Sequence, residues 1–296
     1  MARADCPVCQ GSGWQVVERT AQGAQLLAAA ESARPGASAG EPKTVWAVPC
    51  ECTAADRPER ILAQARVPER YRHCDFENFE ADNEHEGATR EQLETWNRSL
   101  AQAKLLVQRF ASEFPVGCEN GLLLMGPCGA GKTHLAIAAL KEIAKRGHNG
   151  VFYDYRELLK QIQDSYNAES QSTELGVLEP VLRADMLLLD DVGSSKPSLW
   201  ALETVGHILN TRYNEKRVTI ATTNFLDREM AERLEARPSP LVTLPSGERP
   251  TRSDRDTLAD RVGARIRSRL YEMCRTVEVW AADYRKVARN ATLHPA

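Results

Sequence analysis

Between residues 121 and 280 the chain alternates short apolar runs with longer amphipathic stretches. Each run is nearly continuous in apolar residues and bounded by turn-forming residues, which is typical of strands buried on both faces of a sheet. The five runs are GLLLM (121–125), GVFYDY (150–155), MLLLD (186–190), VTIATTN (218–224) and TVEVW (276–280). Because such strands alternate with helices, the pattern predicts an α/β core in which helices flank a parallel sheet.

The stretches between the runs repeat apolar residues at helical spacing. They predict helices that end near Arg146, begin at Arg156, cover about 202–213 and cover about 256–274. Ahead of the core, residues 86–113 predict a further helix and residues 54–65 a short charged one. The stretch 20–43 is rich in Ala, Gly, Ser and Pro, which predicts a mobile loop or a frayed helix.

Composition places the chain among ordinary soluble proteins. Its 296 residues correspond to about two domains, and 38 Lys and Arg against 41 Asp and Glu give a net charge of −3. This balance excludes a wholly basic protein that coats nucleic acid. The apolar runs fall far short of the ~20 residues of a membrane span, and the start MARADCPVC lacks a signal-peptide apolar region. We therefore expect a cytoplasmic protein with no membrane partner.

The segment GPCGAGKT follows the first apolar run and precedes a helix, which is the setting that the phosphate-binding motif GxxxxGK(S/T) requires. Its glycines let backbone N–H groups face phosphates, and the helix N-terminus adds the positive end of its dipole. Lys132 is expected to neutralise the β- and γ-phosphate oxygens of a nucleotide, and the Thr133 hydroxyl to hold Mg²⁺. A chance glycine-rich turn is the alternative. The predicted nucleotide-binding residues here are Gly126, Pro127, Cys128, Gly129, Ala130, Gly131, Lys132, Thr133 and His134.

Two later predicted strands, 186–190 and 218–224, end in polar residues that could reach this site. Asp190 and Asp191 follow MLLL, where Asp190 is expected to support the magnesium ion and Asp191 to polarise the attacking water as a general base. Thr222, Thr223 and Asn224 end VTIATTN and are placed to orient that water or to touch the γ-phosphate. The alternative is ordinary strand-end and turn chemistry.

Four of the eight cysteines lie in the first 52 residues, as CPVC and CEC. In a reducing compartment such cysteines are metal ligands more often than disulfides, and four thiolates complete a tetrahedral zinc site. The 40 residues between the pairs add little to the cost of closure, which grows only logarithmically. An iron–sulfur cluster or free thiols are the alternatives. The predicted structural Zn²⁺ ligands are Cys6, Cys9, Cys50 and Cys52.

The three core motifs, followed by the Arg-rich DRVGARIRSRL, resemble the AAA+ ATPases. YRHCDFENF, GKTHLA, LLLDDVG, NTRYNEKRVTIATTNF, RIRSRLYEMC and ADYR sharpen the resemblance to the DnaC/DnaI-type bacterial helicase loaders and their IstB-like relatives, over about residues 65–288. The resemblance implies an AAA+ P-loop NTPase fold with Lys132 and Thr133 in Walker A, and Asp190 and Asp191 in Walker B. It also implies ATP-controlled assembly on single-stranded DNA and on a DnaB-type replicative helicase.

The same resemblance implies three further roles. Asn224 becomes the first sensor, Arg285 in DYR the second sensor, and Arg269 in SRL the arginine finger that reaches the ATP of a neighbouring subunit. At about 100° per residue from Arg261, Arg269 falls within the apolar arc of its helix, where a solvated arginine is out of place. A snorkelling arginine whose stem packs on the core is the alternative.

Two features depart from the AAA+ pattern. Many members carry Glu where this chain has Asp191, and the shorter side chain predicts looser water positioning, slow hydrolysis and an ATP-driven assembly switch. Only 16 residues follow the last strand at Trp280, which predicts a truncated lid and makes the role of Arg285 less secure.

These features predict a zinc-binding module at residues 1–55 with a flexible loop at 20–43, a connector that docks the helicase at 56–85, and an AAA+ ATPase domain at 86–290. From residue 251 onward ten Lys and Arg face six Asp and Glu, so this segment and the helix from Arg156 are candidates for DNA contact, with a solvated face as the alternative. The predicted function is an ATP-dependent helicase loader. An IstB-like transposition helper and a zinc-dependent adaptor with a structural nucleotide site are the alternatives.

Overall fold

The computed structural model describes residues 6–10, 12, 14–20, 23–26, 44–50, 57–82, 88–166, 173–196, 198–227 and 256–285. The chain forms two compact units, residues 1–60 and residues 61–296. Residues 61–82 of the predicted connector therefore belong to the same unit as the core. Within the described ranges, no helix has both the length and the apolar character that crossing a membrane requires.

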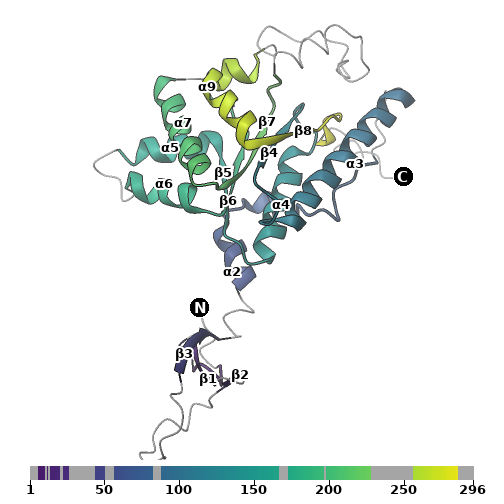
Figure 1. Cartoon of the computed structure of the whole chain (residues 1–296). Helices are drawn as coiled ribbons and strands as arrows, with labels where there is room; N and C mark the ends of the chain where they lie inside the picture. Colours follow the sequence, from purple (N-terminus) through teal and green to yellow (C-terminus); the bar gives the residue numbers. More distant parts are fainter. Residues whose placement is uncertain are drawn as a thin grey trace, which may run out of the picture. The chain divides into compact units, whose positions relative to one another are not determined.

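The first unit is a small antiparallel sheet in the order β2-β1-β3 (Figure 1). Its strands are β1 (Trp14–Thr20), β2 (Gly23–Leu26) and β3 (Thr44–Pro49), with Val17 opposite both Leu26 and Trp46. The expectation of a loop or frayed helix over 20–43 is wrong for Gly23–Leu26, because this segment pairs as a strand. Residues 27–43 and Cys52 lie outside the described residues.

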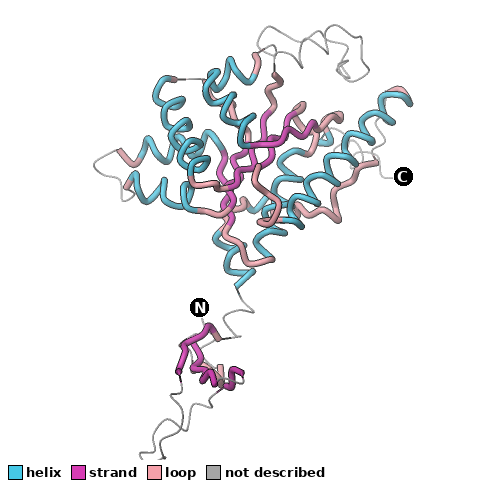
Figure 2. The backbone as a smooth tube through the Cα atoms, in the orientation of Figure 1, coloured by secondary structure: helices cyan, strands magenta, loops and turns pink. Residues whose placement is uncertain are grey.

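The second unit is built on a five-stranded parallel sheet in the order β5-β6-β7-β4-β8, so the α/β prediction is confirmed (Figure 2). Four strands lie where the apolar runs predicted them: β4 (Gly121–Met125), β5 (Gly150–Asp154), β6 (Met186–Asp190) and β7 (Val218–Thr223). The fifth, β8 (Cys274–Glu278), begins and ends two residues before the predicted run 276–280. Because β4 lies between β7 and β8, the segment after β4 starts from the interior of the sheet.

Helices cover both faces of this sheet, which explains why its strands are apolar throughout. Leu122 and Leu124 pack with α3 (Arg90–Glu113) and α4 (Lys132–Lys145) in one core cluster. Leu123 and Met125 point to the other cluster, which contains α5 (Tyr155–Asp164), α6 (Glu174–Arg183), α7 (Leu199–Asn214) and α9 (Leu258–Met273). The other elements among the described residues are α2 (Arg57–Gln64) and the 3₁₀ turn η1 (Glu69–Tyr71).

Two helical predictions need correction, and one helix was missed. The helix expected from residue 86 begins at Arg90, because Thr89 and Gln92 form a reciprocal capping box that fixes its start. Helix α6 was not predicted at all. Helix α9 is interrupted at Gly263 (φ 77°, ψ 154°), so the angular positions counted from Arg261 across this residue are wrong.

Candidate functional site

The carboxyl ends of three neighbouring strands bring the predicted nucleotide motifs together. The segment 126–131 links β4 to α4, Asp191 follows β6, and Asn224 follows β7, the strand that pairs with both β4 and β6. Ligands of open α/β sheets bind at this edge, where polar groups from several strands converge. The site is therefore a property of strand order as well as of motif spacing.

The segment between β4 and α4 needs glycine at its tightest points. Gly131 is the N-cap of α4 with φ 95°, and a Cβ there would lie 2.7 Å from the ring of Phe79. At Gly129 (φ 77°) a Cβ would lie 1.9 Å from Oδ1 of Asp283. These left-handed residues turn the backbone around the start of α4, whose N–H groups and dipole form an anion site. The geometry fits a phosphate group.

Lys132 is buried beneath this loop at 6% exposure. Its Nζ donates to the carbonyl oxygens of Gly126 (2.9 Å) and Pro127 (2.7 Å) and to Oδ1 of Asn224 (2.7 Å). Burial lowers the pKa of Lys132 to about 8, and the positive charge of Arg285 acts in the same direction. The ammonium is thus held next to the loop in an environment that favours a compensating anion.

The oxygen atoms expected to hold magnesium lie together. Thr133 Oγ1 donates to Asp190 Oδ1 at 2.8 Å, and Thr222 Oγ1 donates to the same oxygen at 2.6 Å. Burial raises the pKa of the Asp190 carboxyl, while the hydrogen bonds from the two threonines oppose that rise. Mg²⁺ prefers a small number of hard oxygen ligands beside phosphates, so the donor set fits this ion. Bound there, Mg²⁺ supplies positive charge against the phosphate oxygens.

Asp191 is held in a left-handed conformation (φ 56°), which an L-residue adopts at a cost unless its surroundings fix it. Its N–H donates to Thr222 Oγ1 at 2.9 Å, and its carboxylate accepts from Asn224 Nδ2 at 2.6 Å. Burial raises the pKa of Asp191, Asp154 acts in the same direction, and Lys132 opposes them. The carboxylate of Asp191 thus lies beside Asn224 with a raised pKa, which suits a general base, and that role stays a prediction.

The sequence analysis placed Thr222 near the water but did not identify what its hydroxyl does. In the structure this buried hydroxyl donates to Asp190 and accepts from the N–H of Asp191, so one side chain positions both acidic residues. Asp154 at the end of β5 was missed as well, although its register partner is Asp190. The sequence did offer a signal for Asp154, because this acidic residue ends a predicted strand just as Asp190 does.

The segment after β8 returns to the phosphate-binding loop. The N–H of Val279 donates to the carbonyl of Met125 (2.8 Å), and the N–H of Tyr284 donates to that of Gly129 (3.2 Å). Arg285 lies close enough for its charge to lower the pKa of Lys132. This position suits the predicted second sensor, which stays a prediction.

Two predicted nucleotide contacts have other surroundings. The Cys128 side chain is exposed, in keeping with a tolerated filler. His134 Nε2 lies 2.9 Å from the carbonyl oxygen of Asp75 and 3.0 Å from Oδ1 of Asn78. The imidazole of His134 therefore contacts Asp75 and Asn78. A phosphate at the start of α4 is expected to contact the backbone N–H of His134 and not its side chain.

Arg269 lies apart from these residues, on the face shared by α7 and α9. Its guanidinium donates to Asn210 Oδ1 (2.9 Å), pairs with Glu272 (2.6 Å) and stacks 4.1 Å from the ring centre of Tyr213. With 29% of its side chain exposed, Arg269 is accessible to a neighbouring molecule. Action on another subunit's nucleotide stays a prediction, as does the packing alternative.

Three of the four predicted zinc ligands lie together in the first unit. One ligand atom each from Cys6, Cys9 and Cys50 lies within 4.8 Å of the other two, and the Sγ atoms of Cys6 and Cys50 are 3.7 Å apart. Tetrahedral zinc with Zn–S bonds of about 2.3 Å separates its sulfurs by about 3.8 Å. The donor set therefore fits structural zinc, with Cys52 outside the described residues.

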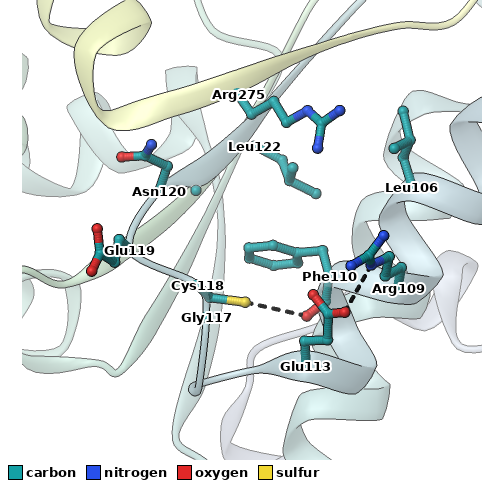
Figure 3. A pocket seen from close by; sticks show the side chains of 11 residues that line it. Leu106, Arg109, Phe110, Glu113, Gly117, Cys118, Glu119, Asn120, Leu122 and Arg275 are labelled. Atoms are coloured by element: carbon teal, nitrogen blue, oxygen red, sulfur yellow. Dashed lines mark hydrogen bonds and ion pairs between the residues drawn. The ribbon is translucent and has the colours of Figure 1, made fainter.

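A separate cavity of about 500 Å³ lies beside the amino end of β4 (Figure 3). Arg109 Nε and Glu113 pair at 2.7 Å in its wall, and the Cys118 thiol donates to the carbonyl oxygen of Phe110 at 3.5 Å. These polar groups satisfy one another. The cavity lies at the end of the strand opposite to the phosphate-binding loop and adds nothing to that site.

Known proteins match most of the core. The family model of IstB-like ATP binding proteins matches residues 53–232. The replicative helicase loader DnaC of Buchnera aphidicola (from Schizaphis graminum) is 26% identical over 176 residues, which are 60% of this chain and 65% of the relative. The match thus spans less than two thirds of that relative's length.

Solved structures agree with the fold. The crystal structure of the DnaC helicase loader aligns with a TM-score of 0.50 and 28% identity, over 72% of this chain and 99% of the other. That of DnaI aligns with a TM-score of 0.50 and 20% identity, over 74% of this chain and 94% of the other, and supports the fold alone. The AAA+ prediction is therefore confirmed. With the family model matching more than half of its length, the chain belongs to the family of IstB-like ATP-binding proteins, and DnaC-type helicase loaders are among its relatives.

Proposed function

We propose that this chain is an ATP-dependent loader that holds a DnaB-type replicative helicase in the cytoplasm and delivers it to single-stranded DNA. The observation that carries the proposal is the chain of contacts from Lys132 through Asn224 to Asp191, which joins the phosphate-binding loop to the ends of two further strands. A nucleotide at this loop must affect all three strands together. The similarity to the DnaC loader, which extends over 99% of that chain, supports the choice of partner.

ATP hydrolysis in this proposal divides the work among the residues already described. Lys132 and the N–H groups at the start of α4 bind the phosphates, Thr133 and Asp190 hold Mg²⁺, and Asn224 orients Asp191. Asp191 accepts the proton of the attacking water. Because Asp191 has one methylene fewer than the usual Glu, it holds that water less closely, so ATP serves mainly as an assembly switch.

The isolated protein is expected to hydrolyse ATP slowly, and single-stranded DNA or the helicase to raise the rate. The measurement is phosphate release by the purified chain with and without each partner. Asp191→Glu is the matched variant, because it restores the longer side chain at the same position. Fast turnover in the isolated wild-type chain would contradict the switch.

The helicase-binding part is assigned to the first unit together with the connector at 56–85, with Zn²⁺ held by Cys6, Cys9, Cys50 and Cys52 as a structural ion. No open coordination position is left for chemistry when four thiolates bind. Residues 61–82 pack with the core, so they are expected to relay the state of the nucleotide site to this module. DNA contacts, mainly to phosphates, are assigned to the basic segment after residue 251 and to the exposed face of α5.

Deleting residues 1–60 is expected to abolish helicase capture while ATP binding is retained, because the boundary between the compact units lies there. The measurement is a pull-down from bacterial lysate with and without ATP, using the full chain and the deletion. The Lys132→Ala chain, with its first unit intact, controls for loss of nucleotide binding. Recovery of a transposase in place of the helicase would favour the IstB-like helper, a second candidate that the matching family model supports. An adaptor with a structural nucleotide site would show no hydrolysis and the same helicase release in Lys132→Ala as in the wild type.

A further inference from the structure

A second group of metal-binding side chains lies in the second unit. The segment of the first unit that carries Cys6, Cys9, Cys50 and Cys52 is called the four-cysteine leader below. His73 and Cys74 follow η1, and His134 lies in the first turn of α4, next to Thr133. One ligand atom of each residue lies within 4.8 Å of the other two. Neither the proposed hydrolysis nor the helicase assignment uses these side chains.

The spacing fits a small tetrahedral ion. Cys74 Sγ and His73 Nε2 are 3.9 Å apart. Zinc bonds of about 2.3 Å to sulfur and about 2.0 Å to nitrogen place such a pair about 3.5 Å apart, so this pair needs a shift of only a few tenths of an ångström. One thiolate and two imidazoles leave one position for water.

The hydrogen bonds around Asn78 fix the tautomer of His134. Asn78 Oδ1 accepts from the N–H of Asp75 at 3.0 Å, and its Nδ2 donates to the His73 carbonyl, so Oδ1 is an acceptor. Nε2 of His134 lies between this Oδ1 and the carbonyl of Asp75, both acceptors, and therefore carries the proton. Its Nδ1 keeps the lone pair. A histidine that donates one N–H to a carbonyl while the other nitrogen stays available has the usual environment of a metal ligand.

The backbone that carries His73 and Cys74 is anchored to α4. Buried Lys141 donates to the carbonyl oxygens of Arg72 (2.8 Å) and Cys74 (3.1 Å) and to Asp75 Oδ2 (2.7 Å). Cys74 itself is 2% exposed, whereas His73 is exposed and leaves a route from solvent. The backbone that carries two of the three ligands is therefore held beside α4 before an ion arrives.

We propose that His73, Cys74 and His134 form a binding site for Zn²⁺ or a similar transition-metal ion, separate from the leader. On binding, the Cys74 thiol releases its proton to solvent and its sulfur forms a bond to the ion. Burial raises the pKa of the Cys74 thiol to about 11, so at neutral pH this proton must be displaced. The ion joins residues 73–74 to the first turn of α4 beside the phosphate-binding loop.

Cobalt titration of the full-length, metal-free protein tests the site, because Co²⁺ bound to thiolate absorbs in proportion to the number of thiolates. An equivalent with the weak absorption of a single thiolate is expected, distinct from the strong absorption of the four-cysteine leader. His73→Gln is expected to weaken this equivalent by more than the about 10- to 100-fold that loss of an outer partner costs. His207→Gln, also an exposed histidine, is the matched control and is expected to bind as the wild type does.

A third variant distinguishes the cobalt absorption of the leader from that of the core site. Cys50→Ser is expected to remove the strong absorption and to leave the weak equivalent unchanged. Because His73 is exposed, His73→Gln keeps the fold, which near-identical thermal unfolding verifies. If the single variant Cys50→Ser and the double variant Cys50→Ser/His73→Gln bind cobalt identically, the core site does not exist.

Discussion

Lys132→Ala is expected to lose ATP binding and hydrolysis while its fold remains as stable as that of the wild type or becomes more stable. The ammonium is the one side-chain cation that the loop itself supplies to the phosphates, and removing a preorganised donor of this kind typically costs about 10²- to 10³-fold. Burial at the same time disfavours the ammonium in the free protein. The residue therefore stabilises the complex at the expense of the unliganded fold.

The pKa of Lys132 gives the stability effect its sign. A fall from 10.5 to about 8 corresponds to about 3 kcal/mol against the charged form in the folded chain. Below pH 8 the folded and unfolded chains both carry the ammonium, and the full cost applies. Between about pH 8 and 10.5 the folded chain releases the proton before the unfolded chain does, so the cost disappears as the pH rises.

Two measurements check this prediction: titration with a fluorescent ATP analogue, and thermal unfolding at several pH values. The unfolding temperature of Lys132→Ala relative to that of the wild type is expected to be highest near pH 7 and to fall above pH 8. Lys160→Ala, which removes an exposed lysine from α5, should change neither measurement. Wild-type affinity for ATP in Lys132→Ala would remove the basis for the nucleotide site.

The core could be predicted because its strands are buried on both faces. Leu122 to Met125 alternate between two helical layers, so every position is apolar and the run is visible without knowledge of the partners. The nucleotide motifs were predictable for a related reason, because a tight turn around the start of a helix requires glycine at fixed positions and a buried strand that ends in acidic residues is recognisable in the sequence. The fold and the site could thus be predicted from the sequence wherever burial or backbone geometry determines the residue type.

Where tertiary contacts decide, the sequence carried less information. Gly23–Leu26 is only four residues long, two of them apolar, and it is recognisable as a strand only through its pairing with β1. Thr222 looks like any strand-end threonine, and its role depends on Asp190 arriving from another strand. Helix α9 is interrupted by the positive φ of Gly263, which hydrophobic periodicity does not reveal. The helical wheel was counted from Arg261 across this interruption, so the angular position that it gave Arg269 was wrong.

Arg269→Ala is expected to lower ATP hydrolysis by about 10³-fold, the lower end of what arginine fingers contribute, while leaving ATP binding to the isolated chain unchanged. In the structure the guanidinium contacts Asn210, Glu272 and Tyr213 on α7 and α9, so we expect no role at the nucleotide of its own chain. A planar, permanently charged fork that remains partly exposed is suited to a phosphate brought by a second copy.

Mixing two inactive chains distinguishes action on a neighbour from a packing role. Arg269→Ala keeps an intact nucleotide site, and Asp191→Asn keeps an intact arginine. If Arg269 acts on the adjacent subunit, an equal mixture regains part of the wild-type hydrolysis. In some subunit contacts, the arginine of an Asp191→Asn chain then faces the intact nucleotide site of an Arg269→Ala chain. Arg265→Ala, which removes an exposed arginine one turn earlier, is the matched control and should keep its activity.

The contacts of Arg269 also predict how a structural role would differ. If its stem only packs on Tyr213, Arg269→Lys would keep most of that contact and most of the activity, whereas a finger needs the fork and would lose both hydrolysis and rescue. Glu272 adds a competing anion at 2.6 Å. Removing that competitor in Glu272→Gln is expected to increase hydrolysis in the assembled state, because the guanidinium leaves its own chain more readily for the neighbour's phosphate. Unchanged hydrolysis in Arg269→Ala would leave the arginine with packing alone.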